Sequence, residues 1–165
     1  KFPKIKLKND RMKDSFLKHS QKVRLISVIP SLDTPVCEIQ THELSENEEL
    51  HPEIERITIS MDLPYAQTRF KEKSKLTNIT YLSDFAYKEF GMKTGLMIKE
   101  KGVLGRAMIV VDREGIVRYL QVVPEILSMP DMKKAIQEGI DSGIAHDFDP
   151  KKHLESLKAK KHSNG

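Results

Sequence analysis

The sequence predicts a single α/β domain, built on a mixed β-sheet with helices on both faces. The chain has 165 residues, a length that fits one domain with a substantial hydrophobic core. Hydrophobic residues make up 38% and charged residues 32% of the chain, a balance typical of a folded protein and not of a disordered one. Short apolar runs alternate with helical patterns, which indicates a βαβ unit followed by a hairpin and a last helix.

The first βα pair lies near the N-terminal third of the chain. Val23–Ile29 is β-branched, strongly apolar and followed by a proline, so it predicts a buried central strand. A helix is predicted from Thr34 to about Glu49, because threonine is a good N-cap and Pro35 suits the first helical position. We expect the inner side of this helix to carry Val36, Ile39 and Leu44.

The next elements continue the alternation of strand and helix. Ile54–Ile59 alternates apolar and polar residues and predicts a strand. A helix is predicted over Pro64–Phe70, with lysines crowding its far end, where cations suit the helix dipole. A short strand is predicted over Ile79–Leu82, and a helical turn over Phe85–Phe90 that Gly91 closes.

The C-terminal half predicts a hairpin and a helix. Ala107–Val111 and Ile116–Val123 read as paired strands, because the four residues Asp112–Gly115 between them form a good turn sequence. A last helix is predicted from Pro130 to about Ile140. We expect the folded domain to cover residues 1–146 and residues 147–165 to form a flexible basic tail.

The positive charge of the chain is concentrated at its ends, which argues against nucleic-acid binding. The net charge is +4, yet residues 1–24 hold nine basic and two acidic side chains, and residues 150–165 hold five lysines and one acid. The central residues are therefore mildly acidic. No basic stripe interleaved with aromatic residues is present. We therefore expect solvated basic ends and no nucleic-acid partner.

The apolar runs and the cysteine content indicate the compartment. No apolar run approaches the length that a membrane span needs, and no signal peptide is visible at the start. The single cysteine excludes an intramolecular disulfide and a cysteine-rich metal site. The six histidines have no paired ligand spacing, so we expect no metal. The sequence has no glycine-rich phosphate-binding loop, so we expect no nucleotide cofactor. The single cysteine favours a reducing compartment, most simply the cytoplasm.

The single cysteine, Cys37, is the candidate nucleophile. If Thr34 caps the helix, Cys37 is its third residue, and its sulfur lies beside the unpaired N–H groups at the positive end of the helix dipole. Such an environment favours the reactive thiolate. On composition alone, a lone cysteine in a cytosolic protein is more often a small buried hydrophobic residue. Its position in the first turn of a helix after a core strand favours a reactive cysteine.

The segment Pro30-x-x-x-Thr34-x-x-Cys37 resembles the signature of the peroxiredoxins, and its surroundings are similar to the bacterial thiol peroxidase subfamily. The resemblance extends over about Phe2 to Gly139. It is carried by four stretches in the same order: Ser27–Thr41 (SVIPSLDTPVCEIQT), Ile59–Phe70 (ISMDLPYAQTRF), Gly105–Asp112 (GRAMIVVD) and Val123–Asp131 (VPEILSMPD). The resemblance implies a thioredoxin-like fold, a homodimer and no prosthetic group.

The resemblance also implies roles for four residues. Cys37 would attack a peroxide oxygen and become a sulfenic acid. Thr34 would orient the thiolate and hydrogen-bond the peroxide, although it could equally be an ordinary helix cap. Pro30 would shield the thiolate, although it could equally end the strand. Arg106 would pair with the sulfur and stabilise the developing charge; without the resemblance, it would read as a surface ion pair.

Two departures from the family bear on the mechanism. Most members carry a second, resolving cysteine directly after the segment that here reads Thr68-Arg69-Phe70, where this chain has Lys71. The sulfenic acid must then be met by an outside thiol, by a cysteine of a second subunit, or by no efficient partner. The outside thiol could be thioredoxin, glutaredoxin or a low-molecular-weight thiol, and the missing cysteine argues against thioredoxin as the direct reductant. We also expect this chain to lack the family's N-terminal hairpin segment, which precedes the equivalent of Phe2.

The sequence therefore predicts a thiol-dependent peroxidase that reduces hydrogen peroxide and small organic hydroperoxides through Cys37. One alternative is a peroxide sensor or interaction module that kept the reactive cysteine and lost turnover. Retention of Thr34, Cys37 and Arg106 favours the enzyme, and Lys71 favours the alternative. A dithiol–disulfide oxidoreductase needs Cys-x-x-Cys, and the first of those positions is Thr34, so this class is nearly excluded.

Overall fold

The computed structural model describes residues 1–18 and 20–143. Its strands are β1 (Ile5–Asn9), β2 (Asp14–Leu17), β3 (Arg24–Val28), β4 (Glu55–Ser60), β5 (Thr80–Ser83), β6 (Met97–Ile98), β7 (Val103–Leu104), β8 (Ala107–Val111) and β9 (Val117–Val122). Its helices are α1 (Pro35–Glu46), α2 (Pro64–Ser74), α3 (Glu89–Thr94) and α4 (Met132–Gly143). The expected tail, residues 147–165, and the domain boundary at residue 146 lie outside the described residues.

Seven strands form one mixed sheet in the order β2-β1-β5-β4-β3-β8-β9. Strands β3, β4 and β5 run parallel, and the pairs β3–β8, β8–β9, β1–β2 and β1–β5 are antiparallel. Strands β3 and β8 are buried along their whole length, because they lie in the middle of the sheet and are covered on both faces. The sheet confirms the predicted βαβ unit and the hairpin that follows it.

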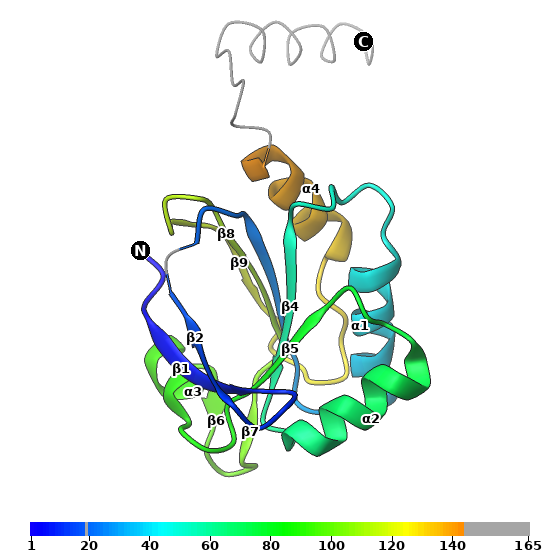
Figure 1. The fold of residues 1–165 in the computed structure, drawn as a ribbon, viewed down its shortest axis with the longest axis vertical. Helices are drawn as coiled ribbons and strands as arrows, with labels where there is room; N and C mark the ends of the chain where they lie inside the picture. The colour runs from blue at the N-terminus through cyan, green and yellow to red at the C-terminus, as the bar shows by residue number, and fades with distance from the viewer. Residues whose placement is uncertain (19, 144–165) are drawn as a thin grey trace, which may run out of the picture.

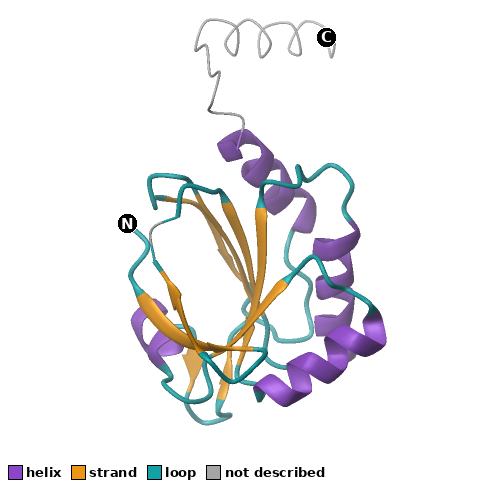
Figure 2. Ribbon diagram, viewed as in Figure 1, coloured by secondary structure: helices purple, strands orange, loops and turns teal. Residues whose placement is uncertain are grey.

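The helices cover both faces of the sheet, as predicted. Figure 1 shows α1, α2 and α4 on one side, and α3 with the β6–β7 hairpin on the other; Figure 2 shows the same layers by element type. Each face has its own apolar cluster. Leu44 of α1 and Ala135 of α4 lie in the first, and Phe90 of α3 lies in the second. The predicted α/β fold is therefore confirmed.

Helix α1 begins where expected, and Leu44 lies on its buried side as predicted. Its buried residues include Cys37, Gln40 and Leu44. The predicted inner position of Ile39 is wrong, because 51% of this side chain is exposed. The helix ends at Glu46, because Arg56 donates to the carbonyl oxygens of residues 45, 47 and 50 and holds the chain in a loop there.

The third helix also differs from the prediction. It spans Glu89–Thr94 and not residues 85–90, so Gly91 lies inside the helix. Buried Asp84 is the reason, because its carboxylate accepts the N–H groups of Phe90 and Gly91 and fixes the start of the helix after a turn. A Cβ atom at Gly91 would lie 2.8 Å from Leu104 Cδ2, so glycine permits the close packing of α3 on the β6–β7 hairpin.

Residues 1–22, to which the sequence analysis assigned no element, contain the hairpin of β1 and β2. Ile5 and Leu7 of β1 and Leu17 of β2 enter the second apolar cluster. Lys6 and Lys8 alternate with these apolar residues, and both pair with exposed Asp14. Because of these charged side chains, the segment has no continuous apolar run that would have predicted a buried strand.

Candidate active site

Cys37 is the third residue of α1, as predicted. Thr34 is the N-cap and Pro35 is the first helical residue. The Thr34 side chain makes no capping hydrogen bond; its hydroxyl donates instead to the carbonyl of Ser31 at 3.1 Å. Cys37 has no exposed surface and carries a free thiol. The sulfur therefore lies at the positive end of α1 but is closed off from solvent.

Arg106 lies beside this sulfur, although 69 residues separate the two in sequence. It directly precedes β8, which pairs antiparallel with β3, and Val28 of β3 faces Ala107. Since α1 follows β3, this register brings the start of β8 beneath the first turn of α1. Arg106 Nη2 donates to Cys37 Sγ at 3.3 Å. The pairing of Cys37 and Arg106 inferred from the family is thus present as a contact.

The rest of the guanidinium is held by neutral acceptors. Its Nε and Nη2 atoms donate to the carbonyl oxygen of Ile126 at 2.9 and 2.7 Å. Its Nη1 atom donates to Gln40 Oε1 at 2.7 Å. Arg106 is only 1% exposed, and no carboxylate among the described residues forms an ion pair with it. Cys37 is therefore the one hydrogen-bonding partner seen here that can carry a negative charge.

Gln40 is the residue of this site that sequence reasoning missed. Its side-chain NH₂ donates to Ser27 Oγ at 2.7 Å and lies 3.4 Å from Met108 Sδ. These donor contacts leave the amide oxygen directed at Arg106, so β3, α1 and the start of β8 join in one buried polar chain. A signal was present in the sequence, because positions three apart on a helix share a face, and Gln40 is three residues after Cys37.

The loop ahead of α1 is held from the neighbouring strand. Asp62 follows β4, and its two carboxylate oxygens accept hydrogen bonds from Ser31 Oγ at 2.7 Å and from the backbone N–H of Leu32 at 2.8 Å. Pro30 is buried at the end of β3, as expected of a residue that ends a core strand. The loop ahead of α1 is therefore held by a side chain that follows the neighbouring parallel strand.

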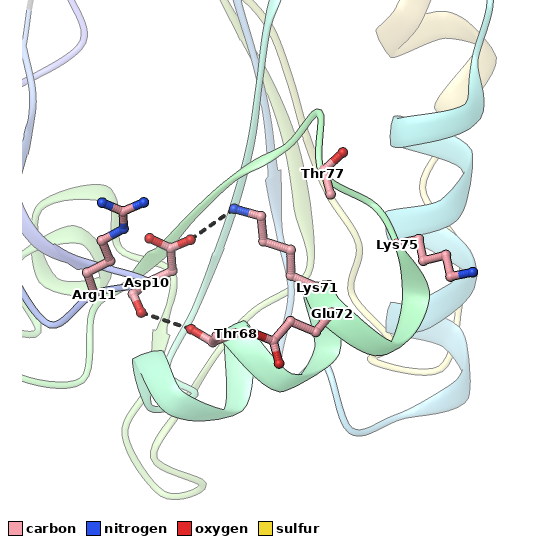
Figure 3. A pocket seen from close by; sticks show the side chains of 7 residues that line it. All are labelled: Asp10, Arg11, Thr68, Lys71, Glu72, Lys75 and Thr77. Carbon is pink, nitrogen blue, oxygen red and sulfur yellow. Dashed lines mark hydrogen bonds and ion pairs between the residues drawn. The ribbon is translucent and has the colours of Figure 1, made fainter.

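Lys71 lies on α2 at the position where the family resemblance led us to expect a second cysteine. Its ammonium lies 3.0 Å from a carboxylate oxygen of Asp10, in the turn between β1 and β2. Thr68, one turn earlier on α2, donates to the backbone carbonyl of Asp10 at 2.9 Å. Figure 3 shows both interactions at a shallow pocket between the turn and the helix. Here α2 is tied to the N-terminal hairpin.

Neither a metal-ligand cluster nor a membrane-spanning helix occurs in the part of the chain that the structure describes. No group of three His, Cys, Asp or Glu side chains in that part of the chain is placed to hold a metal ion. None of the helices within residues 1–18 and 20–143 combines the length and apolar character needed to cross a membrane.

Comparisons with known proteins agree with this geometry. A profile of the Redoxin family matches residues 1–136. The thiol peroxidase of Aquifex aeolicus (strain VF5) is 41% identical over 119 residues, which cover 70% of each chain. The thiol peroxidase of Campylobacter jejuni is 39% identical over 135 residues, 80% of this chain and 77% of the relative.

Solved structures give the same result for the fold. The crystal structure of a peroxiredoxin-like protein from Aquifex aeolicus has a TM-score of 0.78 at 34% identity, covering 84% of this chain and 83% of that one. The thiol peroxidase from Chromobacterium violaceum has a TM-score of 0.70 at 23% identity, covering 85% of both chains.

Proposed function

The chain belongs to the Redoxin family and is a peroxiredoxin-type thiol peroxidase, and from this premise we propose that the sulfur of Cys37 attacks the peroxide. The contact between Cys37 Sγ and buried Arg106 Nη2, at 3.3 Å, carries the proposal. A buried cation is costly unless it is paired. Since the other acceptors of Arg106 are neutral, a thiolate at Cys37 is the negatively charged partner that this buried cation lacks.

In the oxidation step, an electron pair of the thiolate forms a bond to one peroxide oxygen. The O–O bond breaks, and its electrons leave with the second oxygen, which takes up a proton and departs as water or as an alcohol. Cys37 becomes a sulfenic acid. Arg106 then stabilises the charge that develops on the leaving oxygen, and its fixed hydrogen bonds to Gln40 and Ile126 remove the cost of reorienting it.

Thr34 and Pro30 have proposed roles beside the sulfur. The Thr34 hydroxyl bonds to the Ser31 carbonyl, so it would have to rotate to donate to a bound peroxide. Its backbone already fixes the start of α1, because the Thr34 carbonyl accepts the N–H of Glu38. Buried Pro30 presents no N–H group near the site, and we assign it to shielding the thiolate from water.

The regenerating thiol comes from outside this chain, because Cys37 is its single cysteine. We therefore propose an external thiol as reductant and hydrogen peroxide or a small organic hydroperoxide as substrate. We further propose the reducing environment of a bacterial cytoplasm and a homodimeric assembly, for which the family resemblance is the support. The sensor alternative is not favoured, because the matched relatives are named for peroxidase activity.

The decisive experiment follows the sulfur itself. Wild-type protein receives one equivalent of hydrogen peroxide in the presence of a sulfenic-acid trap, and intact mass spectrometry counts the adducts. We expect one adduct per chain, located at Cys37, and none in Cys37→Ser. Consumption of peroxide with excess thiol should be lost in the same variant. A wild-type thiol that stays unmodified would exclude the peroxidase function.

A further inference from the structure

A groove lies between α1 and α2, on the face of the sheet that carries the Cys37 helix. It has a volume of about 720 Å³, within the range of small-molecule sites. One side is formed by the loop before α1 and the first turns of that helix, and the other by α2; the two helices cover the same face of the sheet in Figure 1. The groove thus lies next to the segment that holds the nucleophile.

The two sides of this groove carry opposite charges. Arg69 and Lys73, one turn apart on α2, line one side, and both are exposed. Asp33 and Glu38 line the other. Within the described part of the chain, none of these four side chains makes a hydrogen bond or an ion pair. The remaining charged groups there are engaged, because His42 pairs with Glu46 and Asp62 holds the loop before α1.

Two apolar residues of the groove belong to, or pack against, the buried cluster that also contains Cys37. Leu32 lines the groove and also belongs to the buried apolar cluster that contains Cys37. Phe70 lines it from the other side and packs against the same cluster. Because Cys37 has no exposed surface, a thiol in the groove reaches the sulfur only after a local opening, and we propose that the loop around Leu32 is the segment that moves. That loop is held by two hydrogen bonds to Asp62.

We propose that this groove binds the reductant, and that the reductant is a low-molecular-weight thiol carrying both an ammonium and a carboxylate group, such as an amino-acid or short peptide thiol. The inference rests on the proposed function, since it needs Cys37 to be oxidised by peroxide. Arg69 and Lys73 receive the carboxylate, and Asp33 and Glu38 receive the ammonium. A neutral thiol of similar reactivity gains nothing from these charges.

The reduction takes place in two balanced steps. The thiolate of the first reductant molecule attacks the sulfenic sulfur, forms a mixed disulfide with Cys37 and expels hydroxide, which leaves as water after protonation. A second reductant thiolate attacks the reductant's sulfur in the mixed disulfide. Cys37 leaves as the thiolate, and the two reductant molecules are joined in a disulfide. Two thiols are oxidised for each peroxide reduced, and no other electron source is required.

The test separates the two half-reactions. Protein is first oxidised with one equivalent of hydrogen peroxide, and formation of the sulfenic acid is confirmed by mass spectrometry. It is then mixed rapidly with glutathione or with the neutral 2-mercaptoethanol at matched thiolate concentrations. Quenched samples give the rate of mixed-disulfide formation. We expect glutathione to react at least tenfold faster and to show saturation. Raising the ionic strength should reduce this advantage, because ions screen exposed charges.

Charge variants then locate the binding site. We expect the double variant Arg69→Gln/Lys73→Gln to lower the glutathione rate at least fivefold, and Glu38→Gln to lower it by a smaller factor. Neither should change the rate with 2-mercaptoethanol by more than twofold. Lys99→Gln, which removes one exposed positive charge in the turn of the β6–β7 hairpin, is the control for a change of surface charge away from the groove and should leave both rates unchanged.

Three results would overturn the inference and leave the proposed function intact. The first is equal reactivity of glutathione and 2-mercaptoethanol with the sulfenic acid. The second is a groove variant that behaves as the Lys99→Gln control does. The third is reduction by thioredoxin that is faster than by glutathione and insensitive to the groove variants. Failure of the protein to form a sulfenic acid at all would instead remove the proposed function.

Discussion

Two buried arginines lie at opposite ends of the same pair of strands, and only one is placed for chemistry. Arg24 begins β3 and faces Val111, at the far end of the β3–β8 ladder from Arg106. They are 2% and 1% exposed, respectively. Burial of a cation is therefore not the feature that distinguishes the active site.

The difference between the two arginines is in their partners. Arg24 donates one hydrogen bond, to the carbonyl of Lys18 at 2.9 Å, stacks over the ring of Phe2 at 5.7 Å, and its Nε has no partner within the described residues. Burial lowers the pKa of the Arg24 guanidinium, although nearby Glu55 opposes this. Arg106 has every donor nitrogen engaged and directs one of them at a sulfur. The feature that distinguishes Arg106 is therefore its hydrogen bond to a nucleophilic sulfur.

The largest expected effect separates the two arginines by activity. Arg106→Met should slow the reaction of Cys37 with peroxide at least tenfold, about 1.4 kcal/mol or more of transition-state stabilisation. Arg24→Met should leave this rate within twofold. Stopped-flow oxidation of the two variants measures both, with circular dichroism to verify folding. Equal losses in the two variants would refute the distinction.

A second variant examines whether the fixed position of Arg106 matters as well as its charge. Gln40→Leu keeps the guanidinium but removes the acceptor at 2.7 Å from Nη1. We expect the peroxide rate to fall about threefold to tenfold, less than in Arg106→Met, because preorganised hydrogen bonds account for part of the electrostatic stabilisation. An unchanged rate would assign Gln40 to packing alone. The same stopped-flow assay decides this.

The third prediction concerns stability at the other end of the ladder. Arg24→Met removes a poorly satisfied buried charge but leaves the Lys18 carbonyl without its donor. Because these effects oppose each other, we expect the free energy of unfolding to change by about 1 kcal/mol or less. Urea denaturation with an unchanged slope measures it. A loss several times larger would mean that Arg24 is essential to the N-terminal part of the sheet.

The smallest expected effect is at Lys71, a partly exposed cation that contrasts with both arginines. Lys71→Ala breaks the ion pair with Asp10. The side chains of Lys71 and Asp10 are 30% and 25% exposed, respectively. Such pairs contribute roughly 0.2–1 kcal/mol, so the free energy of unfolding should fall by that amount and the peroxide rate should not change. Denaturation in low and high salt measures it, since screening should shrink the difference. A slower peroxide reaction in Lys71→Ala would instead mean that the Lys71–Asp10 ion pair contributes to catalysis.

The sequence alone determined the features that depend on short segments. Thr34, Pro35 and Cys37 lie within four consecutive residues, so local capping and helix geometry were enough to place the sulfur in the first turn of α1. Strands β3 and β8 were predicted correctly because continuous apolar runs signal burial on both faces. The N-terminal hairpin was missed because a half-buried edge with many lysines lacks such a run.

Only the tertiary structure decided what surrounds the sulfur. From sequence, Arg106 could be linked to Cys37 through resemblance, but the 3.3 Å contact exists because β8 pairs with β3 in a particular register. The link from Gln40 to Ser27, the hydroxyl direction of Thr34 and the complete burial of Cys37 likewise depend on packing between segments distant in the chain. Local propensity is set by neighbouring residues, whereas hydrogen-bond partners and solvent access are set by the strands and helices that the fold brings together.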